Sequence, residues 1–171
     1  MTASIQTHGM KQMLTELRQL EPELHKQIRS ELVVSAMPFA AAVGAEFPET
    51  ALQNWQRKRS RSGKARLPAY HAGLARKGVK PVYSTSTRRN AILRVEQKNA
   101  GGQVYDSAGS RSDVVFVRNL DKHLRTKSRL GKSRSRVMYA GAKKNMAMVE
   151  KPVKDILSRI EKRIQNKIVG G

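Results

Sequence analysis

Near its C-terminus the chain reads Met146-Ala-Met-Val-Glu-Lys-Pro-Val-Lys-Asp-Ile-Leu-Ser-Arg-Ile-Glu-Lys-Arg-Ile-Gln-Asn-Lys-Ile168. Its apolar side chains recur in steps of three and four and alternate with charged ones, which predicts an amphipathic helix. They are Met146, Val149, Val153, Ile156, Leu157, Ile160, Ile164 and Ile168. We expect Ile156, Ile160 and Ile164 in the core. Pro152 is expected to kink this helix, or to separate a first turn from a main part that begins near Val153.

The same periodicity recurs at the other end of the sequence. Met10, Leu14, Leu17 and Leu20 predict a short helix that ends before Pro22. A second helix is predicted from Pro22 to about Gly44, with a kink at Pro38. Its apolar face contains Leu24, Ile28, Leu32, Ala36, Phe39, Ala40 and Val43. Trp55 follows this region and is interpreted as a packing residue.

Four short runs between these helical regions are rich in β-branched residues and predict strands. They cover residues 80–87, 91–96, 102–106 and 113–118. Turns are expected at residues 99–102 and 109–112, which would give a small antiparallel sheet. The predicted fold class is therefore α+β. A small antiparallel β-sheet is packed by an N-terminal helix and a long C-terminal amphipathic helix, with extended basic loops, in one domain over residues 1–171.

The charge of the chain is strongly positive and unevenly distributed. The 171 residues include 34 Lys and Arg against 13 Asp and Glu, a net charge of +21, which requires an acidic partner. Residues 1–56 hold four basic and six acidic side chains, whereas residues 57–98 hold 13 basic and one acidic. Basic arm or loop insertions are predicted at about 56–80 and 121–136, in two stretches that also contain Gly and Ser.

Twelve basic side chains in these insertions are the candidate site for an acidic partner. They are Arg57, Lys58, Arg59, Arg61, Lys64, Arg66, Arg125, Lys127, Arg129, Lys132, Arg134 and Arg136. Charge blocks of this density are typical of interaction segments, although solvated loops that aid solubility have the same composition. The partner is either an acidic protein surface or the phosphates of a nucleic acid.

The sequence gives no support for catalysis, a metal site or a cofactor. The absence of cysteine removes disulfides, thiol chemistry and cysteine-based metal sites. The histidines His8, His25, His71 and His123 lack the spacing of metal ligands. Asp106 and Asp113 could meet across a hairpin, but a two-metal nuclease needs more carboxylates. No nucleotide-binding or nucleophile motif occurs, so we predict that the protein is not an enzyme.

Membrane insertion and sequence-specific nucleic-acid binding are also not indicated. The longest apolar stretch, Leu32 to Ala45, is shorter than a membrane span, and the first ten residues do not resemble a signal peptide. No membrane partner is predicted, and the cytoplasm is the expected compartment. The aromatic residues are scattered, so base stacking is not predicted, but a non-specific phosphate contact stays open.

The order of these elements resembles the head–tail joining and tail-completion (neck) protein family of long-tailed bacteriophages. Three segments carry the resemblance: 17–32 with Ala36-Met-Pro-Phe39, Val104-Tyr-Asp-Ser-Ala-Gly109 and Ser135-Arg-Val-Met-Tyr-Ala-Gly-Ala142. The resemblance implies a structural virion protein of the neck or tail end, assembled in the host cytoplasm. It would form a ring, hexameric or dodecameric, between the capsid connector and the tail, and would contact adjacent neck and tail proteins. A non-specific contact with packaged DNA is also open. No catalytic residues come with it.

A second interpretation rests on charge alone. A non-specific nucleic-acid-binding protein, ribosome-associated or nucleoid-like, would use the same basic stretches on a phosphate backbone. It predicts binding by the monomer that weakens steeply with salt.

Overall fold

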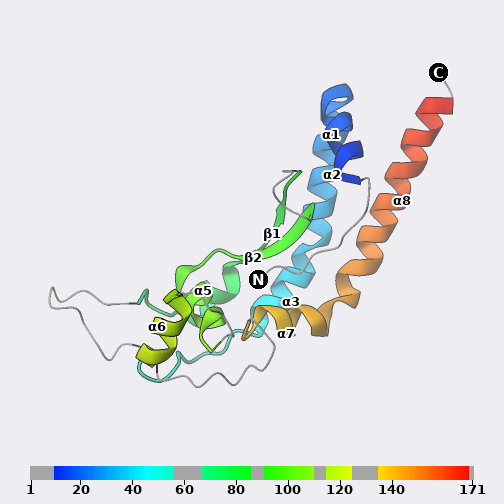
Figure 1. Cartoon of the computed structure of the whole chain (residues 1–171). Coiled ribbons are helices and arrows are strands. Elements are labelled where there is room, and N and C mark those ends of the chain that lie inside the picture. The colour runs from blue at the N-terminus through cyan, green and yellow to red at the C-terminus, as the bar shows by residue number, and fades with distance from the viewer. Residues whose placement is uncertain (1–9, 56–66, 86–90, 110–114, 125–134, 170–171) are drawn as a thin grey trace.

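The computed structural model describes residues 10–55, 67–85, 91–109, 115–124 and 135–169. The molecule is elongated (Figure 1). Helices α1, α2 and α8 extend toward one end, and helices α5 and α6 form the other end (Figure 1). The sheet lies between them (Figure 1).

The N-terminal region forms three helices: α1 (Met10–Leu20), α2 (Pro22–Ser35) and α3 (Met37–Ala45). Pro22 occupies the first turn of α2, where its missing N–H costs no hydrogen bond. The predicted second helix is confirmed, but it breaks at Ala36 because Pro38 has no N–H to donate to the preceding turn. Pro38 lies in the first turn of α3, so the backbone changes direction just before the proline.

A two-stranded antiparallel sheet is formed by β1 (Val79–Tyr83) and β2 (Leu93–Gln97). Val79 pairs with Gln97 and Tyr83 pairs with Leu93. The short helix α4 (Ala72–Lys77) leads directly into β1, and α2, α3 and α4 all pack against β1. The predicted α+β class with a small antiparallel sheet is therefore confirmed, and two of the four predicted strands are found.

The strand predicted over 102–106 is wrong, because residues 100–107 form helix α5 (Ala100–Ser107). The predicted turn at 99–102 is the start of this helix. Asn99 is its N-cap, and the Asn99 side chain accepts a hydrogen bond of 2.8 Å from the backbone N–H of Gly102. A Cβ on Gly101 would lie 2.5 Å from the carbonyl oxygen of Ala69, so only glycine allows this close approach.

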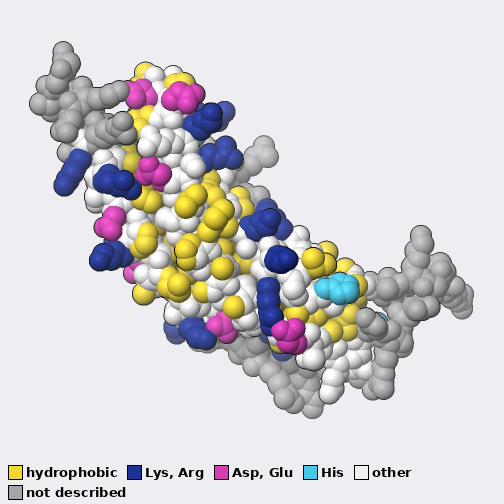
Figure 2. All heavy atoms as spheres, turned by 180° about the vertical axis from the view of Figure 1, so that it is seen from behind, with side chains coloured by type: hydrophobic (Ala, Val, Ile, Leu, Met, Phe, Trp, Pro, Cys, Tyr) yellow, Lys and Arg dark blue, Asp and Glu magenta, His cyan; other side chains and the backbone are white. Residues whose placement is uncertain are grey.

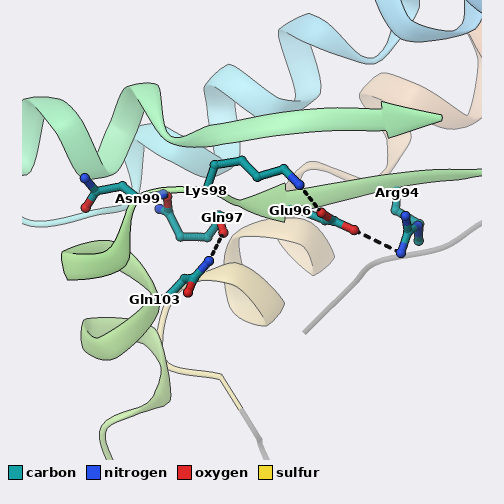
Figure 3. A network of polar contacts seen from close by, with 6 residues as sticks. All are labelled: Arg94, Glu96, Gln97, Lys98, Asn99 and Gln103. Atoms are coloured by element: carbon teal, nitrogen blue, oxygen red, sulfur yellow. Dashed lines mark hydrogen bonds and ion pairs between the residues drawn. The ribbon is translucent and has the colours of Figure 1, made fainter. Parts of the chain in front are cut away.

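Polar contacts fix the junction between β2 and α5 (Figure 3). The Gln103 side chain donates to the carbonyl oxygen of Gln97 at 2.7 Å. The Gln97 side chain donates to the carbonyl oxygen of Ala75 at 2.8 Å and accepts from the backbone N–H of Asn99 at 2.8 Å. Next to Gln97, Glu96 forms ion pairs with Arg94 at 2.9 Å and with Lys98 at 2.5 Å (Figure 3). These contacts hold α5 at the end of the sheet.

The strand predicted over 113–118 is also wrong in its described part, where helix α6 (Val115–Leu124) begins. The run Val115-Phe-Val looks like a strand because of its β-branched residues. Val117, Leu120 and Leu124 nevertheless follow a helical period and are buried on one face of α6. The two runs that this hairpin would join are helical where they are described, and residues 110–114 lie outside the described residues.

The predicted C-terminal helix is confirmed as α8 (Ala147–Val169), and it is preceded by a helix that was not predicted, α7 (Met138–Asn145). Helix α8 runs without interruption through Pro152, so no first turn is separated. Ile156 and Ile160 are buried, whereas the side chain of Ile164 lies outside the described residues. Helix α8 packs on α2 and α3, and α7 packs on α3.

The two predicted insertions are narrower than expected. Residues 72–80 of the first one form α4 and the start of β1, and residues 121–124 of the second one are the last turn of α6. The expectation of loops is wrong for these flanks, because Ala75, Val79 and Leu124 are buried core side chains. Residues 56–66 and 125–134 lie outside the described residues.

One helical stretch in the described part of the chain, Pro22–Ala45, is long and apolar enough to cross a membrane by length and composition. The prediction from the sequence considered only the shorter run from Leu32. In the structure 39% of the 18-residue window of this stretch is buried inside the molecule. A core helix of a globular protein passes the same test, so the finding is weak evidence for a membrane span.

Candidate functional site

The two basic stretches 56–66 and 125–134 are the candidate interaction segments. The structure describes the residues that flank them on either side. Eleven of the twelve predicted site residues lie within these stretches and therefore outside the described residues. Arg136 is the one that the structure describes. The site is accordingly built from the residues that hold the ends of the two stretches.

An aromatic cluster holds both ends of the first stretch. The indole N–H of Trp55 donates to the carbonyl oxygen of Pro68 at 2.9 Å, so residues on either side of the stretch are bonded to each other. The ring of Trp55 packs edge-on against Tyr70 at 5.7 Å and lies 6.2 Å from Tyr105. Tyr70 and Tyr105 lie 4.9 Å apart. Trp55 is thus a packing residue, as predicted.

The end of the second stretch is fixed by the carboxylate of Asp106 on α5. One oxygen, Oδ1, accepts from the Ser135 hydroxyl at 2.8 Å, the Val137 N–H at 2.7 Å and the Met138 N–H at 2.9 Å. The Ser135 hydroxyl in turn accepts from the Tyr139 N–H at 2.8 Å. Together these bonds satisfy three free N–H groups at the start of α7. Asp106 is 6% and Ser135 1% exposed, so the charge is buried and offset by hydrogen bonds.

Arg136 makes several contacts within this part of the fold. Its Nε and Nη2 both donate to the carbonyl oxygen of Ala108, at 3.1 and 2.9 Å. Its guanidinium lies 5.9 Å from the centre of the Tyr105 ring. Its backbone N–H donates to the carbonyl oxygen of Asp106 at 2.9 Å. Arg136 is only partly buried, so its grouping with the basic interaction residues stays a prediction beside these contacts within the fold.

The two stretches are also linked where they begin. The Asn54 amide donates to the carbonyl oxygen of Leu124 at 3.4 Å, and Leu124 is the last described residue before the second stretch. Asn54 has a backbone φ of 65°, a left-handed conformation that asparagine tolerates better than most residues. We call the residues that hold both stretches the anchor cluster: Asn54, Trp55, Tyr70, Tyr105, Asp106, Leu124, Ser135 and Arg136.

The electrostatics of the anchor cluster keep its tyrosines neutral. Burial raises the pKa of Tyr105 above its ordinary value, and the nearby Arg136 guanidinium opposes this only in part. Burial also raises the pKa of Tyr70, and its neighbour Tyr105 adds to the effect. The Tyr70 hydroxyl therefore remains a donor, and it bonds to the carbonyl oxygen of Pro48 at 2.6 Å.

The described residues offer little for chemistry on a bound substrate. Among them no group of three His, Cys, Asp or Glu side chains is placed to hold a metal ion. A groove of about 190 Å³ lies between α2 and α8, with apolar walls from Leu24, Ile28, Ile156 and Ile160. Glu31 and Arg159 form an ion pair of 3.2 Å at this groove. The anchor cluster can position charged segments, which is a binding role.

Sequence reasoning missed most of the anchor cluster. It treated Asp106 as a possible partner of Asp113, whereas Asp106 bonds to the start of α7, and Asp113 lies outside the described residues. It did not bring Asn54, Tyr70 and Ser135 together, because they are far apart in the sequence. One signal was present, since 104–109 and 135–142 are two of the three segments on which the resemblance rests. The structure joins these two segments through Asp106.

Comparison with known proteins adds no relative, since no family model, no curated protein and no solved structure matches this chain. The functional argument therefore rests on the chain itself.

Proposed function

We propose that this chain is a structural virion subunit of the phage neck or tail end. It forms a ring of identical copies that joins the capsid connector to the tail, as a head–tail connector, tail-completion or tail-terminator protein. Its two basic stretches bind acidic surfaces of neighbouring subunits and of adjacent neck and tail proteins. The protein acts in the virion, after assembly in the host cytoplasm.

The observation that carries this proposal is that residues flanking both basic stretches contact one anchor cluster. Residues 56–66 contain six basic and no acidic side chains, and residues 125–134 contain five basic and none acidic. Trp55, Pro68, Leu124 and Ser135 lie beside these stretches and are held by the contacts of the anchor cluster. Fixed ends lower the entropy lost when such a segment is ordered on a partner. Two densely basic segments of this kind suit assembly with an acidic neighbour.

Light scattering on the purified protein at low and high salt tests the proposal, with and without duplex DNA. We expect oligomers of defined mass that do not need DNA. Replacing Lys127, Arg129 and Lys132 by Glu should abolish assembly and leave the fold intact. A matched control replaces the exposed Lys151, Lys154 and Lys162 of α8 by Glu. Both variants change the net charge equally, so normal assembly by the first would contradict the proposal.

A non-specific nucleic-acid-binding protein is the second candidate function. The observation that favours it is the same charge density, eleven basic side chains without one acid in two short stretches. Such a protein would stay monomeric and would coat duplex DNA. The logarithm of its binding constant would fall with the logarithm of salt by about 0.9 for each phosphate neutralised. This outcome in the light-scattering experiment would replace the ring proposal.

A further inference from the structure

The last turn of α2 and helix α3 are apolar on two opposite faces. The inner face, with Leu32, Phe39 and Val43, is buried in the core. The opposite face carries an exposed apolar stripe with helical spacing, which we call the outer stripe: Val34, Met37, Pro38, Ala41 and Ala45. Val34 is 57% and Met37 53% exposed. An apolar helix with no polar face is normally buried on all sides, so the outer stripe lacks its cover in the single chain.

The outer stripe is specific to one part of the helix. Toward the start of α2 the same face carries Glu23, Gln27 and Ser30, which are ordinary solvent-exposed residues. From Leu32 to Ala45 the sequence has no charged side chain. Figure 2 shows hydrophobic side chains gathered across the middle of one face, with charged side chains around them.

A second exposed apolar surface lies at the start of α6. Val115 is 60% and Phe116 54% exposed, while Val117, Leu120 and Leu124 cover the inner face of the same helix. Figure 1 places α6 at the end of the molecule that is remote from the tips of α1 and α8, and apart from α3. The single chain therefore presents two separate apolar surfaces.

We propose that the outer stripe of one copy packs on the start of α6 of the next copy, in a head-to-tail contact. This inference rests on the proposed ring function and names the surfaces that would close the ring. Two different surfaces on each copy are what a heterologous contact requires, and such contacts generate rings. At 1.5 Å per residue, residues 34–45 span about 18 Å, which is long enough to cover Val115 and Phe116 in the first turn of α6. Ala41 and Ala45 have small side chains that let another helix approach closely.

Charge favours a second copy as the occupant. Two chains of net charge +21 repel each other, so they approach best where charge is absent, as on the outer stripe. The segment 1–56, which includes the outer stripe, holds six acidic against four basic side chains. The basic stretch 125–134 directly follows α6 in the sequence. The contact would therefore bring the basic stretch of one copy toward the most acidic segment of the next.

A lipid bilayer is a poorer occupant of the same surface. The inner face of α2 and α3 packs on β1, α7 and α8, and a membrane-spanning helix would have to leave these contacts. The polar residues Glu23 and Gln27 on the outer face would also enter the hydrocarbon.

A lysine introduced at an exposed position of either surface tests the contact without disturbing the core. We would measure the mass of the wild type, Met37→Lys and Phe116→Lys by light scattering, and check each fold by circular dichroism. Leu20→Lys is the matched control, because Leu20 is 80% exposed and lies before the start of α2, away from the outer stripe. We expect the wild type and Leu20→Lys to form the same oligomer. Met37→Lys and Phe116→Lys should each fall to the mass of one chain, 19.1 kDa.

Mixing the two variants gives the decisive result. Met37→Lys keeps an intact α6 surface and Phe116→Lys keeps an intact outer stripe, so the mixture should form a pair of chains and nothing larger. Oligomers that survive both substitutions would overturn this inference and leave the ring function standing. A dimer of Phe116→Lys alone would overturn it too, because the stripe would then pack on itself.

A wild type that is monomeric at every concentration would overturn both the ring function and this inference. Vesicles of phosphatidylcholine, which carry no net charge, complete the experiment. Binding of the monomeric wild type to these vesicles, lost in Met37→Lys, would assign the outer stripe to a membrane instead.

Discussion

The Asp106 carboxylate on α5 accepts a hydrogen bond of 2.8 Å from the hydroxyl of Ser135, a residue 29 positions further along the chain. The same oxygen accepts from the first N–H groups of α7. This arrangement joins the end of the second basic stretch to the helix that follows the sheet. If a partner that binds residues 125–134 displaced Ser135, it would also disturb α5 and the aromatic cluster that packs on it.

Asp106→Ala should be strongly destabilising, because it leaves the Ser135 hydroxyl and the N–H groups of Val137 and Met138 without their acceptor. Unsatisfied buried donors cost about 1–3 kcal/mol each, so we expect a loss of about 3 kcal/mol or more in the free energy of unfolding. Urea denaturation measures this loss. Asp155→Ala on the exposed face of α8 is the control, since it makes the same change in a helix. Equal losses in the two variants would show that the Asp106 contacts contribute nothing.

Arg136→Ala should lower the free energy of unfolding by about 1.5–3 kcal/mol, the range for hydrogen bonds that involve a charged group. The substitution removes both bonds to the Ala108 carbonyl and the contact with Tyr105. Arg118→Ala, at an exposed position of α6, should change it by less than about 0.5 kcal/mol. An Arg136→Ala protein as stable as Arg118→Ala would show that the contacts of Arg136 with Ala108 and Tyr105 do not stabilise the fold.

Gly44→Ala and Gly73→Ala should have opposite effects on stability. A Cβ on Gly44 would lie 2.6 Å from the carbonyl oxygen of Arg76, where α3 meets α4, so the helices must separate at a cost of about 1–3 kcal/mol. A Cβ on Gly73 meets no atom within 4 Å, and alanine in this exposed turn of α4 should stabilise by about 0.5–1 kcal/mol. Thermal unfolding of both variants tests the pair, and a shift in the same direction would contradict the packing of α3 on α4.

The sequence was sufficient for the parts of the fold that depend on helical period. The apolar stripes of α1, α2 and α8 were predicted because apolar residues recur every three to four positions in these segments. The periodic pattern stops before Pro22 in the first segment and at about Gly44 in the second. The wrong predictions fell on α5 and α6, where short β-branched runs suggested strands. In α5 the Asn99 cap and the close approach of Gly101 to Ala69 decide for a helix. The Asn99 cap is a local signal that the strand prediction did not use, whereas the approach of Gly101 to Ala69 joins residues far apart in the sequence.

The candidate site was predictable in charge but not in geometry. The basic stretches can be recognised from the composition. The contacts made by the residues that flank them cannot. Asn54, Tyr70 and Ser135 come together only because β1, β2 and α5 fold between them, and long-range packing of this kind has no local pattern. Arg136 shows the consequence, since by sequence it is one more basic residue of a dense stretch. By structure it is the residue that binds Ala108 and covers Tyr105.

Stability should fall as the pH drops below about 6.5, and His25 should account for a measurable part of the fall. Burial, together with Arg18 and Arg29, lowers the pKa of His25 below its ordinary value of 6.5, while its Nε2 lies 3.0 Å from the Tyr83 hydroxyl. Below pH 6.5 the unfolded chain therefore takes up the proton first, and the stabilising contribution of neutral His25 is lost as the pH approaches the folded pKa. In urea denaturation at pH 7.5, 6.5 and 5.5, His25→Gln should lose less stability on acidification than the wild type. Parallel losses in both proteins would mean that His25 titrates equally in the folded and unfolded chains.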